Sequence, residues 1–265
     1  MGRRRLDAEL VRRGLAESRA EAQEAVQAGH VIVRGAPATK STTLVGADES
    51  LALAGPARPF VSRGGEKLAA ALDRFAIDVS DRACLDAGAS TGGFTDCLLH
   101  RGARHVVALD VGHGQLAWEL RTDPRVTVLE KTNVRELVPG LLPYRPSLVT
   151  ADLSFISLRL AAAPLVAVSE PVVDLVLLVK PQFEVERSEV ERGGVVRDPS
   201  LWRRAIAAVA DAIAAAGAGA GGVMVSPIRG PAGNVEFLLH ARTALGHASL
   251  DIDTAIEAAQ AMVAT

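Results

Sequence analysis

The sequence predicts an α/β protein in which a doubly wound, mostly parallel sheet follows a small α+β module. From residue 83 onward, short apolar segments alternate with helical patterns, as in parallel strands joined by crossover helices. Residues 5–54 differ, because two short helical patterns precede a few strand patterns there. At 265 residues, the chain is long enough for one large domain and one small domain.

The small module is predicted from helical spacing and turn residues. Apolar residues from Leu6 to Leu15 recur at helical spacing, and Gly14 can cap that helix. Ser18 opens a second helix, Glu21 completes a capping box, and Gly29 ends the helix. Strands are expected at residues 30–35, where the strand runs into a turn, and at residues 51–53.

A domain boundary is predicted after this module. The run Gly55-Pro56-Ala57-Arg58-Pro59 breaks both helix and strand. We therefore expect a first domain at residues 1–55, a linker at 56–65 and a second domain at 66–265, which opens with a helix over residues 66–72.

The second domain carries the alternating pattern. Strands are predicted at residues 83–86, 106–110, 126–129, 148–152, 175–179, 223–225 and 236–240. Helices are predicted at residues 94–101, 115–121, 157–168, 201–216 and 251–264.

A glycine-rich stretch between the first of these strands and the first helix predicts a ligand site. Such a turn lets backbone approach a ligand and directs helix N–H groups toward it. The dinucleotide pattern needs three glycines, but here the spacing gives Gly88, Ser90 and Gly93. Asp110 follows about 20 residues later, where a carboxylate can bind a ribose diol. An adenosine ligand without a pyrophosphate, above all S-adenosylmethionine, fits better than NAD; the alternative is a tight turn that binds no ligand.

Composition narrows the class of protein. A net charge of −2 argues against a generally basic nucleic-acid binder, so any such surface must be local. Cys84 and Cys97 have no metal-type spacing and are expected to be reduced core residues, with no metal site. No secretory signal and no window able to span a bilayer is visible, which predicts a cytoplasmic protein without a membrane partner.

A local basic surface is predicted in the small module. Arg12, Arg13 and Arg19 could form one phosphate-facing stripe on its helices, with Arg34 and Lys40 beyond them. A solvated charged face would have the same composition.

Polar residues follow the predicted strands, where ligands bind in an open parallel sheet: Asp86, Asp110, Asn133, Asp152 and Lys180. Lys180 is distinctive because only Lys40, Lys67, Lys131 and Lys180 are lysines among 29 basic residues. Lysine, unlike arginine, can lose its proton when it is desolvated or lies near another cation. Lys180 is therefore a candidate general base, with a structural ion pair as the alternative.

The order of residues 3–55 resembles the S4-type RNA-binding module. The resemblance rests on Arg5-Leu6-Asp7, Leu10, Gly14, Ser18-Arg19 and Ala22, followed by Gly29-x-Val31-x-Val33; Arg34-Gly35 replaces the more usual Asn-Gly. It implies binding of structured RNA through the basic residues Arg4, Arg5, Arg12, Arg13, Arg19, Arg34 and Lys40.

Almost the whole chain resembles the TlyA (hemolysin A) family. The resemblance rests on residues 86–96, on Asp152-Leu153-Ser154-Phe155-Ile156-Ser157, on Lys180-Pro181-Gln182-Phe183-Glu184 and on the Gly230–Phe237 segment. It implies an S4-type module before a Rossmann-like, FtsJ-like domain that methylates cytidine riboses in small- and large-subunit rRNA and influences sensitivity to capreomycin-type antibiotics. Phe60 stands where the family pattern has Trp.

The resemblance also implies site residues and partners. The catalytic tetrad would be Lys67, Asp152, Lys180 and Glu236. The chemistry of the residues agrees, since burial and nearby Lys67 are expected to lower the pKa of Lys180 and let it act as the base. S-adenosylmethionine would be bound by Asp86, Gly88, Ala89, Ser90, Thr91, Gly92, Gly93, Phe94, Asp110, Asn133 and Asp152. The partner would be rRNA or a ribosomal subunit, and the protein would act as a monomer.

Three other functions compete with this one. A membrane-active hemolysin needs an amphipathic or transmembrane element, which is not visible in the sequence. A non-catalytic rRNA-binding assembly factor would have a disrupted glycine turn or an incomplete tetrad. A small-molecule O-methyltransferase would have no use for residues 1–55.

Overall fold

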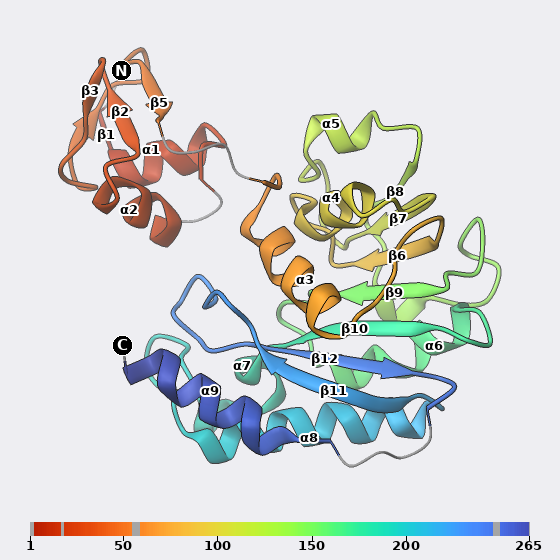
Figure 1. Ribbon diagram of the computed structural model, residues 1–265. Coiled ribbons are helices and arrows are strands. Elements are labelled where there is room, and N and C mark those ends of the chain that lie inside the picture. Colours follow the sequence, from red (N-terminus) through yellow and green to blue (C-terminus); the bar gives the residue numbers. More distant parts are fainter. Residues whose placement is uncertain (1–2, 17–18, 55–58, 246–249, 265) are drawn as a thin grey trace. The chain divides into compact units, whose positions relative to one another are not determined.

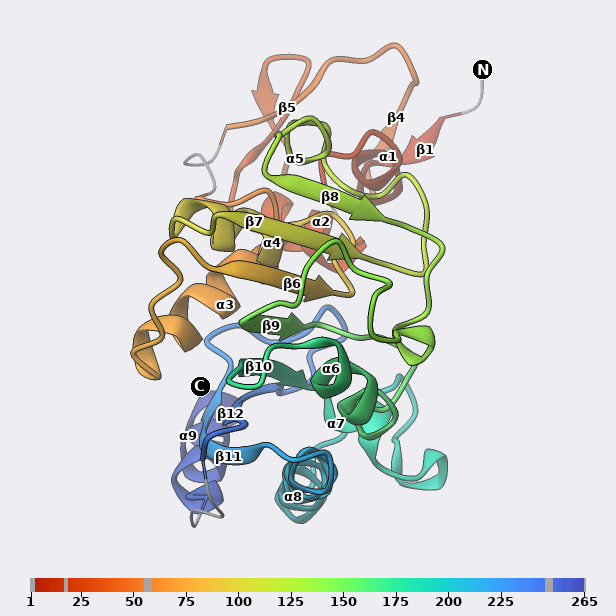
Figure 2. The ribbon, with the colours of Figure 1, turned by 90° about the vertical axis from the view of Figure 1, so that its right-hand side faces the viewer.

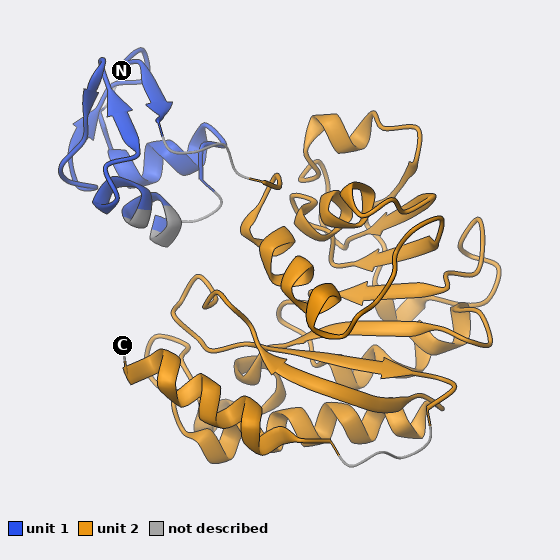
Figure 3. Cartoon of the chain, in the orientation of Figure 1, with its two compact units in different colours: residues 1–58 blue, residues 59–265 orange. Residues whose placement is uncertain are grey.

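The computed structural model describes residues 3–16, 19–54, 59–245 and 250–264. The chain divides into two compact units, residues 1–58 and 59–265 (Figure 3). The predicted Ser18 helix cap and most of the proline-rich boundary lie outside the described residues.

The first unit is a small α+β fold around a core of Leu6, Leu10, Ala22, Val26 and Val31. Both predicted helices and both predicted strands are present. Strands of two residues each were not predicted, because they are too short to show a pattern. The elements are β1 (Arg4–Arg5), α1 (Leu6–Arg12), α2 (Arg19–Gln27), β2 (Val31–Val33), β3 (Ala36–Pro37), β4 (Leu44–Val45) and β5 (Leu51–Leu53); β2 lies between β3 and β5, and β1 pairs with β4.

The second unit is built on a sheet with the strand order β11-β12-β10-β9-β6-β7-β8 (Figures 1 and 2). Strands β6 to β10 are parallel, whereas β12 runs antiparallel to both of its neighbours. The doubly wound sheet predicted from the sequence is therefore confirmed. Its strands are β6 (Ala83–Ala87), β7 (His105–Leu109), β8 (Val126–Leu129), β9 (Leu148–Ala151), β10 (Asp174–Val179), β11 (Gly219–Val225) and β12 (Phe237–Arg242).

Helices cover both faces of this sheet, and strand periodicity decides which residue meets which face. In β10, Leu175, Leu177 and Val179 pack in one core with α6 (Ala162–Val168), α8 (Pro199–Ala215) and α9 (Ile252–Ala264). Val176 and Leu178 point the other way, into a core with α3 (Arg63–Arg74) and α4 (Gly93–His100). Burial on both faces explains why the strand is a continuous apolar run.

Helix boundaries differ from the prediction at three places. Helix α3 begins at Arg63, inside the segment predicted as a linker, because the Ser62 hydroxyl caps it by accepting a hydrogen bond from Gly64. The helix predicted over residues 157–168 is divided into η2 (Leu158–Leu160) and α6, since Pro164 has no N–H to donate to the Leu160 carbonyl. The helix predicted over 115–121 is only α5 (Trp118–Arg121). The short α7 (Pro181–Glu184), η1 (Val134–Glu136) and η3 (Arg187–Glu189) were not predicted.

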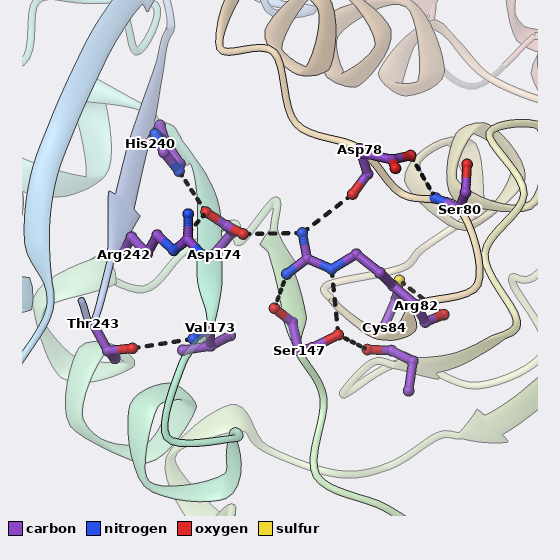
Figure 4. A network of polar contacts seen from close by, with 11 residues as sticks. Asp78, Ser80, Arg82, Cys84, Ser147, Val173, Asp174, His240, Arg242 and Thr243 are labelled. Atoms are coloured by element: carbon purple, nitrogen blue, oxygen red, sulfur yellow. Dashed lines mark hydrogen bonds and ion pairs between the residues drawn. The ribbon is translucent and has the colours of Figure 1, made fainter. Parts of the chain in front are cut away.

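A polar network joins the amino ends of the parallel strands, at the edge opposite the glycine-rich turn (Figure 4). Arg82 donates to Asp174 at 2.9 Å and to the Ser147 hydroxyl at 3.3 Å, and His240 lies 3.0 Å from Asp174. Burial alone would raise the pKa of Asp174. Hydrogen bonds from His240 and Arg82, with the charges of Arg82 and Arg242, outweigh burial and hold this pKa below its usual value.

This shift makes part of the stability of the fold sensitive to acid. A carboxyl whose pKa is lower in the folded than in the unfolded state stabilises the protein above its unfolded pKa of about 3.9. That contribution is lost as the pH falls through the folded pKa. Asp174→Asn should therefore lower the free energy of unfolding by about 1–3 kcal/mol at pH 7, and the deficit should shrink below about pH 4. Urea unfolding between pH 3 and 7 measures it, with exposed Asp211→Asn as the control; a deficit independent of pH would contradict this role.

Candidate cofactor and active site

The glycine-rich turn sits where the strand order of the sheet reverses, between β6 and β9. Gly88 follows β6 with φ +85°, a left-handed conformation that favours glycine. A Cβ atom at this position would overlap the carbonyl oxygen of Asp152, which follows β9. Only glycine therefore lets the ends of these two strands approach so closely. In doubly wound sheets, this switch point is where ligands bind.

Asp110, at the end of β7, fixes the shape of the turn. Its two carboxylate oxygens accept hydrogen bonds from the backbone N–H groups of Ser90, at 2.8 Å, and Gly112, at 2.6 Å. Ser90 is itself left-handed, with φ +48°. A carboxylate has about four acceptor positions, so Asp110 keeps acceptor capacity for a ligand hydroxyl.

A cavity of about 740 Å³ lies beside this turn, within the size range of small-molecule sites. It combines several of the predicted cofactor residues with residues that the sequence did not single out for the cofactor. The predicted ones are Gly88, Ser90, Asp110, Asn133 and Asp152; the others include Val111, Gln115, Arg135, Ser154, Phe155 and Leu160. Asn133 also caps η1 by accepting a hydrogen bond from the Arg135 N–H.

The remaining predicted cofactor residues, Asp86, Ala89, Thr91, Gly92, Gly93 and Phe94, do not line this cavity. Gly92 and Gly93 are sites of close packing, where a Cβ atom would overlap Leu120 and the Ser62 hydroxyl respectively. Asp86 is fully buried and accepts hydrogen bonds from Thr95 at 2.7 Å and Thr150 at 3.2 Å. Burial raises the pKa of Asp86 to about 7, against the opposing hydrogen bond from Thr95. These residues form the inner support of the turn.

The four predicted catalytic residues form two ion pairs at the same edge of the sheet. Lys180, directly after β10, lies 2.5 Å from Asp152, and Lys67 of α3 lies 2.6 Å from Glu236, directly before β12. Lys67, Lys180 and Glu236 are buried. The sequence suggested a direct effect of Lys67 on Lys180, whereas each lysine has its own carboxylate partner here.

A second cavity of about 400 Å³ contains Lys180 and Glu236, and it shares Ser154 and Phe155 with the first. Its wall is held by Asn234, which is buried and joins two loops. The Asn234 side chain accepts from the Val196 N–H at 2.9 Å and donates to the Gly194 carbonyl at 2.7 Å. Asn234 belongs to the Gly230–Phe237 motif, which was identified from the sequence. Its partners lie about 40 positions away in the chain, so the sequence does not predict these hydrogen bonds.

Phe155, at the lip shared by the two cavities, is the most unusual residue of the site. Its side chain is 93% exposed, and its backbone is left-handed with φ +63°. Only the ring of Phe183, at 5.4 Å between centroids, is recorded as an aromatic neighbour among the described residues. The exposed ring is therefore free to contact a molecule bound in either cavity.

The predicted RNA-binding residues of the first unit divide into two groups. Arg13 is mostly buried, pairs with Glu9 and donates to the carbonyls of Gly46, Ala47 and Glu49, so it holds the loop before β5 in place. The others keep exposed side chains, several of them paired with nearby carboxylates: Arg4 and Arg12 with Glu9, Arg5 and Arg19 with Asp7, and Arg34 with Glu49, while Lys40 is exposed.

The arrangement of possible metal ligands and of the two cysteines can be read from the described part of the chain. There, no group of three or more His, Cys, Asp or Glu side chains is placed to hold a metal ion. Cys84 and Cys97 are free and buried, and burial raises the pKa of each thiol to about 12.

Comparison with known families agrees with this geometry. Residues 60–243 match the FtsJ-like methyltransferase family, and residues 4–50 match the S4 domain. Fold and site together define an S-adenosylmethionine-dependent methyltransferase of the FtsJ-like class that carries an S4 domain.

Individual relatives narrow the class further. The 16S/23S rRNA (cytidine-2′-O)-methyltransferase TlyA of Mycobacterium tuberculosis (strain ATCC 25618 / H37Rv) is 54% identical over 91% of this chain and 90% of its own length. Hemolysin A of Brachyspira hyodysenteriae is 39% identical over 89% of this chain and 98% of its own length. The chain belongs to the TlyA family.

A solved structure covers nearly the same extent. A Streptococcus thermophilus protein whose name contains the word hemolysin is 38% identical, with a TM-score of 0.81 over 99% of this chain and 97% of that one. The similarity therefore includes both units of the fold.

The cavity leads to a prediction about the methyl donor. Asp110→Ala removes a carboxylate that is placed to accept from a ribose diol, a charged hydrogen bond worth about 1.5–3 kcal/mol. Affinity for S-adenosylmethionine should fall roughly 10- to 150-fold, as measured by calorimetry. Asp73→Ala, at an exposed pair with Arg101, is the control. Unchanged affinity in the Asp110 variant would remove this residue from the site.

Proposed function

We propose that this protein transfers the methyl group of S-adenosylmethionine to the 2′-hydroxyl of a cytidine in rRNA. The observation that carries the proposal is the Lys180–Asp152 pair, at 2.5 Å, beside Ser154 and Phe155, which line both cavities. A donor in the larger cavity and a nucleotide in the smaller one would meet at these residues. The relative from Mycobacterium tuberculosis, which carries this activity in its name, supports the same reaction.

Methyl transfer to a ribose hydroxyl needs a general base rather than a nucleophilic side chain. A ribose 2′-hydroxyl is a poor nucleophile until its proton is removed. S-adenosylmethionine supplies an electrophilic methyl group on a sulfonium centre. Lys180, in its neutral form, would accept the hydroxyl proton, and Asp152 would stabilise the ammonium ion that results. Glu236, which lines the smaller cavity and is held by the buried Lys67, would orient the ribose.

We assign cofactor binding first to the residues that line the larger cavity. Asp110 would accept from the ribose hydroxyls, and Gly88, Ser90, Asn133 and Asp152 would form the wall around the donor. Asp86, Ala89, Thr91, Gly92, Gly93 and Phe94 would support it from behind. The exposed ring of Phe155 would stack on the target base, an interaction typical of single-stranded RNA recognition.

The S4 domain would deliver the RNA. We assign RNA binding to residues 1–55 and catalysis to residues 66–265, with residues 56–65 as the connection. The exposed residues Arg4, Arg5, Arg12, Arg19, Arg34 and Lys40 would contact phosphates. Arg13 would hold the loop of Glu49, the residue that pairs with Arg34. Because S4 domains and rRNA methyltransferase relatives point to RNA, the substrate would be rRNA or a ribosomal subunit.

An rRNA substrate leads to proposals about the targets of the protein and its place of action in the cell. Both subunit rRNAs would be targets, as in the name of the Mycobacterium tuberculosis relative, and loss of methylation would change sensitivity to capreomycin-type antibiotics. We further propose that the protein acts on rRNA as a monomer in the cytoplasm.

The competing functions gain no specific support. A non-catalytic assembly factor would not need two buried lysine–carboxylate pairs at the switch point. For a hemolysin, a bilayer-spanning helix would be one route, but across the described ranges no helix is both long and apolar enough.

The base assignment predicts an asymmetry between the two lysines. Lys180→Arg should lower the single-turnover rate of methyl transfer to rRNA about 10²- to 10⁴-fold, because a guanidinium does not release its proton in a protein. Lys67→Arg keeps the cation that faces Glu236 and should be milder. Affinity for S-adenosylmethionine is measured separately for both variants. A fully active Lys180→Arg enzyme would refute the base.

The RNA assignment predicts a change in salt dependence. A variant with both Arg34→Ala and Lys40→Ala should lose about two phosphate contacts. The slope of log affinity for rRNA against log salt concentration should then become shallower by about two. Fluorescence anisotropy with labelled rRNA measures it. The control replaces the exposed Arg125 and Arg203 with alanine, which removes the same charge from the other unit. Equal slopes in both double variants would exclude Arg34 and Lys40 from the interface.

A further inference from the structure

Ser154 makes a contact that the four charged residues do not account for. The Lys180 Nζ atom donates a hydrogen bond to the Ser154 hydroxyl oxygen at 2.9 Å, in addition to its 2.5 Å ion pair with Asp152. Both acceptors follow β9 and are separated only by Leu153, which is buried and anchors the segment. Their positions relative to Lys180 are therefore set by the sheet itself.

A directional contact determines where the lone pair of an amine points. A neutral lysine amine has two N–H bonds and one lone pair in a tetrahedral arrangement. The 2.5 Å contact with Asp152 is an ion pair without hydrogen-bond geometry, so the hydrogen bond donated to Ser154 is the contact that gives the amine its direction. With Asp152 alone, the amine could turn about its Cε–Nζ bond, and its lone pair would spend time in unproductive directions.

Ser154 is placed where this direction matters. It lines both the 740 Å³ cavity and the 400 Å³ cavity, and Lys180 lines the smaller one. The residue itself is exposed at the rim of these cavities, and its hydroxyl oxygen accepts from the buried Lys180 amine. The hydrogen bond that the mostly buried Lys180 donates to Ser154 can fix the orientation of the amine.

We infer that Ser154 is a positioning residue that aims the Lys180 amine at the target hydroxyl; this inference rests on the proposed function. The proton moves from the ribose O2′ to Nζ, while the O2′–methyl bond forms and the methyl–sulfur bond of the donor breaks. The amine becomes an ammonium ion with three N–H bonds, one of which keeps donating to Ser154, while Asp152 stays in ion-pair contact and balances the new charge. Both contacts thus hold the same geometry before and after the transfer.

The test is a double-mutant cycle in the full-length protein, measured as single-turnover methyl transfer to rRNA. Ser154→Ala should lower the rate about 10- to 100-fold. Affinities for S-adenosylmethionine and rRNA should stay within about twofold of the wild type. Ser154→Thr, which keeps the hydroxyl, should restore most of the rate. In a Lys180→Ala background, Ser154→Ala should have no further effect, because the residue it positions is gone. Exposed Ser200→Ala, on α8, is the control.

Each outcome has a separate meaning. Full activity of Ser154→Ala, or an equal loss with and without Lys180, would overturn the positioning role while leaving the proposed function intact. A loss that appears as weaker binding of the donor, with an unchanged rate at saturation, would also overturn it, since Ser154 would then act as a cavity wall. Absence of methylation by the wild-type protein on rRNA or on either ribosomal subunit would instead contradict the proposed function.

Discussion

The close approach of Gly88 to the Asp152 carbonyl is the constraint on which the site depends. It brings the ends of β6 and β9 together at the point where the strand order reverses. The turn after β6 carries Ser90, whose N–H is held by Asp110, and the segment after β9 carries Asp152, which pairs with Lys180. One backbone contact therefore sets the distance between the larger cavity and the candidate base. A side chain at residue 88 would separate the two halves of the site.

Charge is distributed differently at the two edges of the sheet. At the carboxyl edge, Lys67, Lys180 and Glu236 are buried in pairs, an arrangement whose desolvation cost makes it a weak source of stability. At the amino edge, Asp174 receives hydrogen bonds from Arg82 and His240, and its lowered pKa indicates net stabilisation of the charged form (Figure 4). The fold is thus stabilised at the amino edge of the sheet, remote from the cavities, where the polar groups have no part in the proposed reaction.

The architecture could be predicted from the sequence for two reasons. Strands buried on both faces are continuous apolar runs, and turns carry recognisable residues. The polar residues that follow those strands were found for the same reason. The partners of individual side chains could not be predicted from the sequence. Periodicity does not indicate which lysine pairs with which carboxylate, or that Arg13 holds a loop in place. The glycines of the turn looked alike in sequence, yet Gly88 lines the cavity while Gly92 and Gly93 serve helix packing. The exposure of Phe155 depends on a left-handed backbone conformation, which no sequence pattern predicts.

The antiparallel course of β12 places its first residues at the carboxyl edge of the parallel strands, which is how Glu236 reaches Lys67 across 169 positions of sequence. Strand β12 also lies between β10 and β11, so β11 cannot join the sheet before β12 has been made. During synthesis, a growing chain that already displays its RNA-binding module would have neither a complete sheet nor a complete set of charges. The topology therefore delays catalytic competence until β12 has left the ribosome, the particle whose RNA it is proposed to modify.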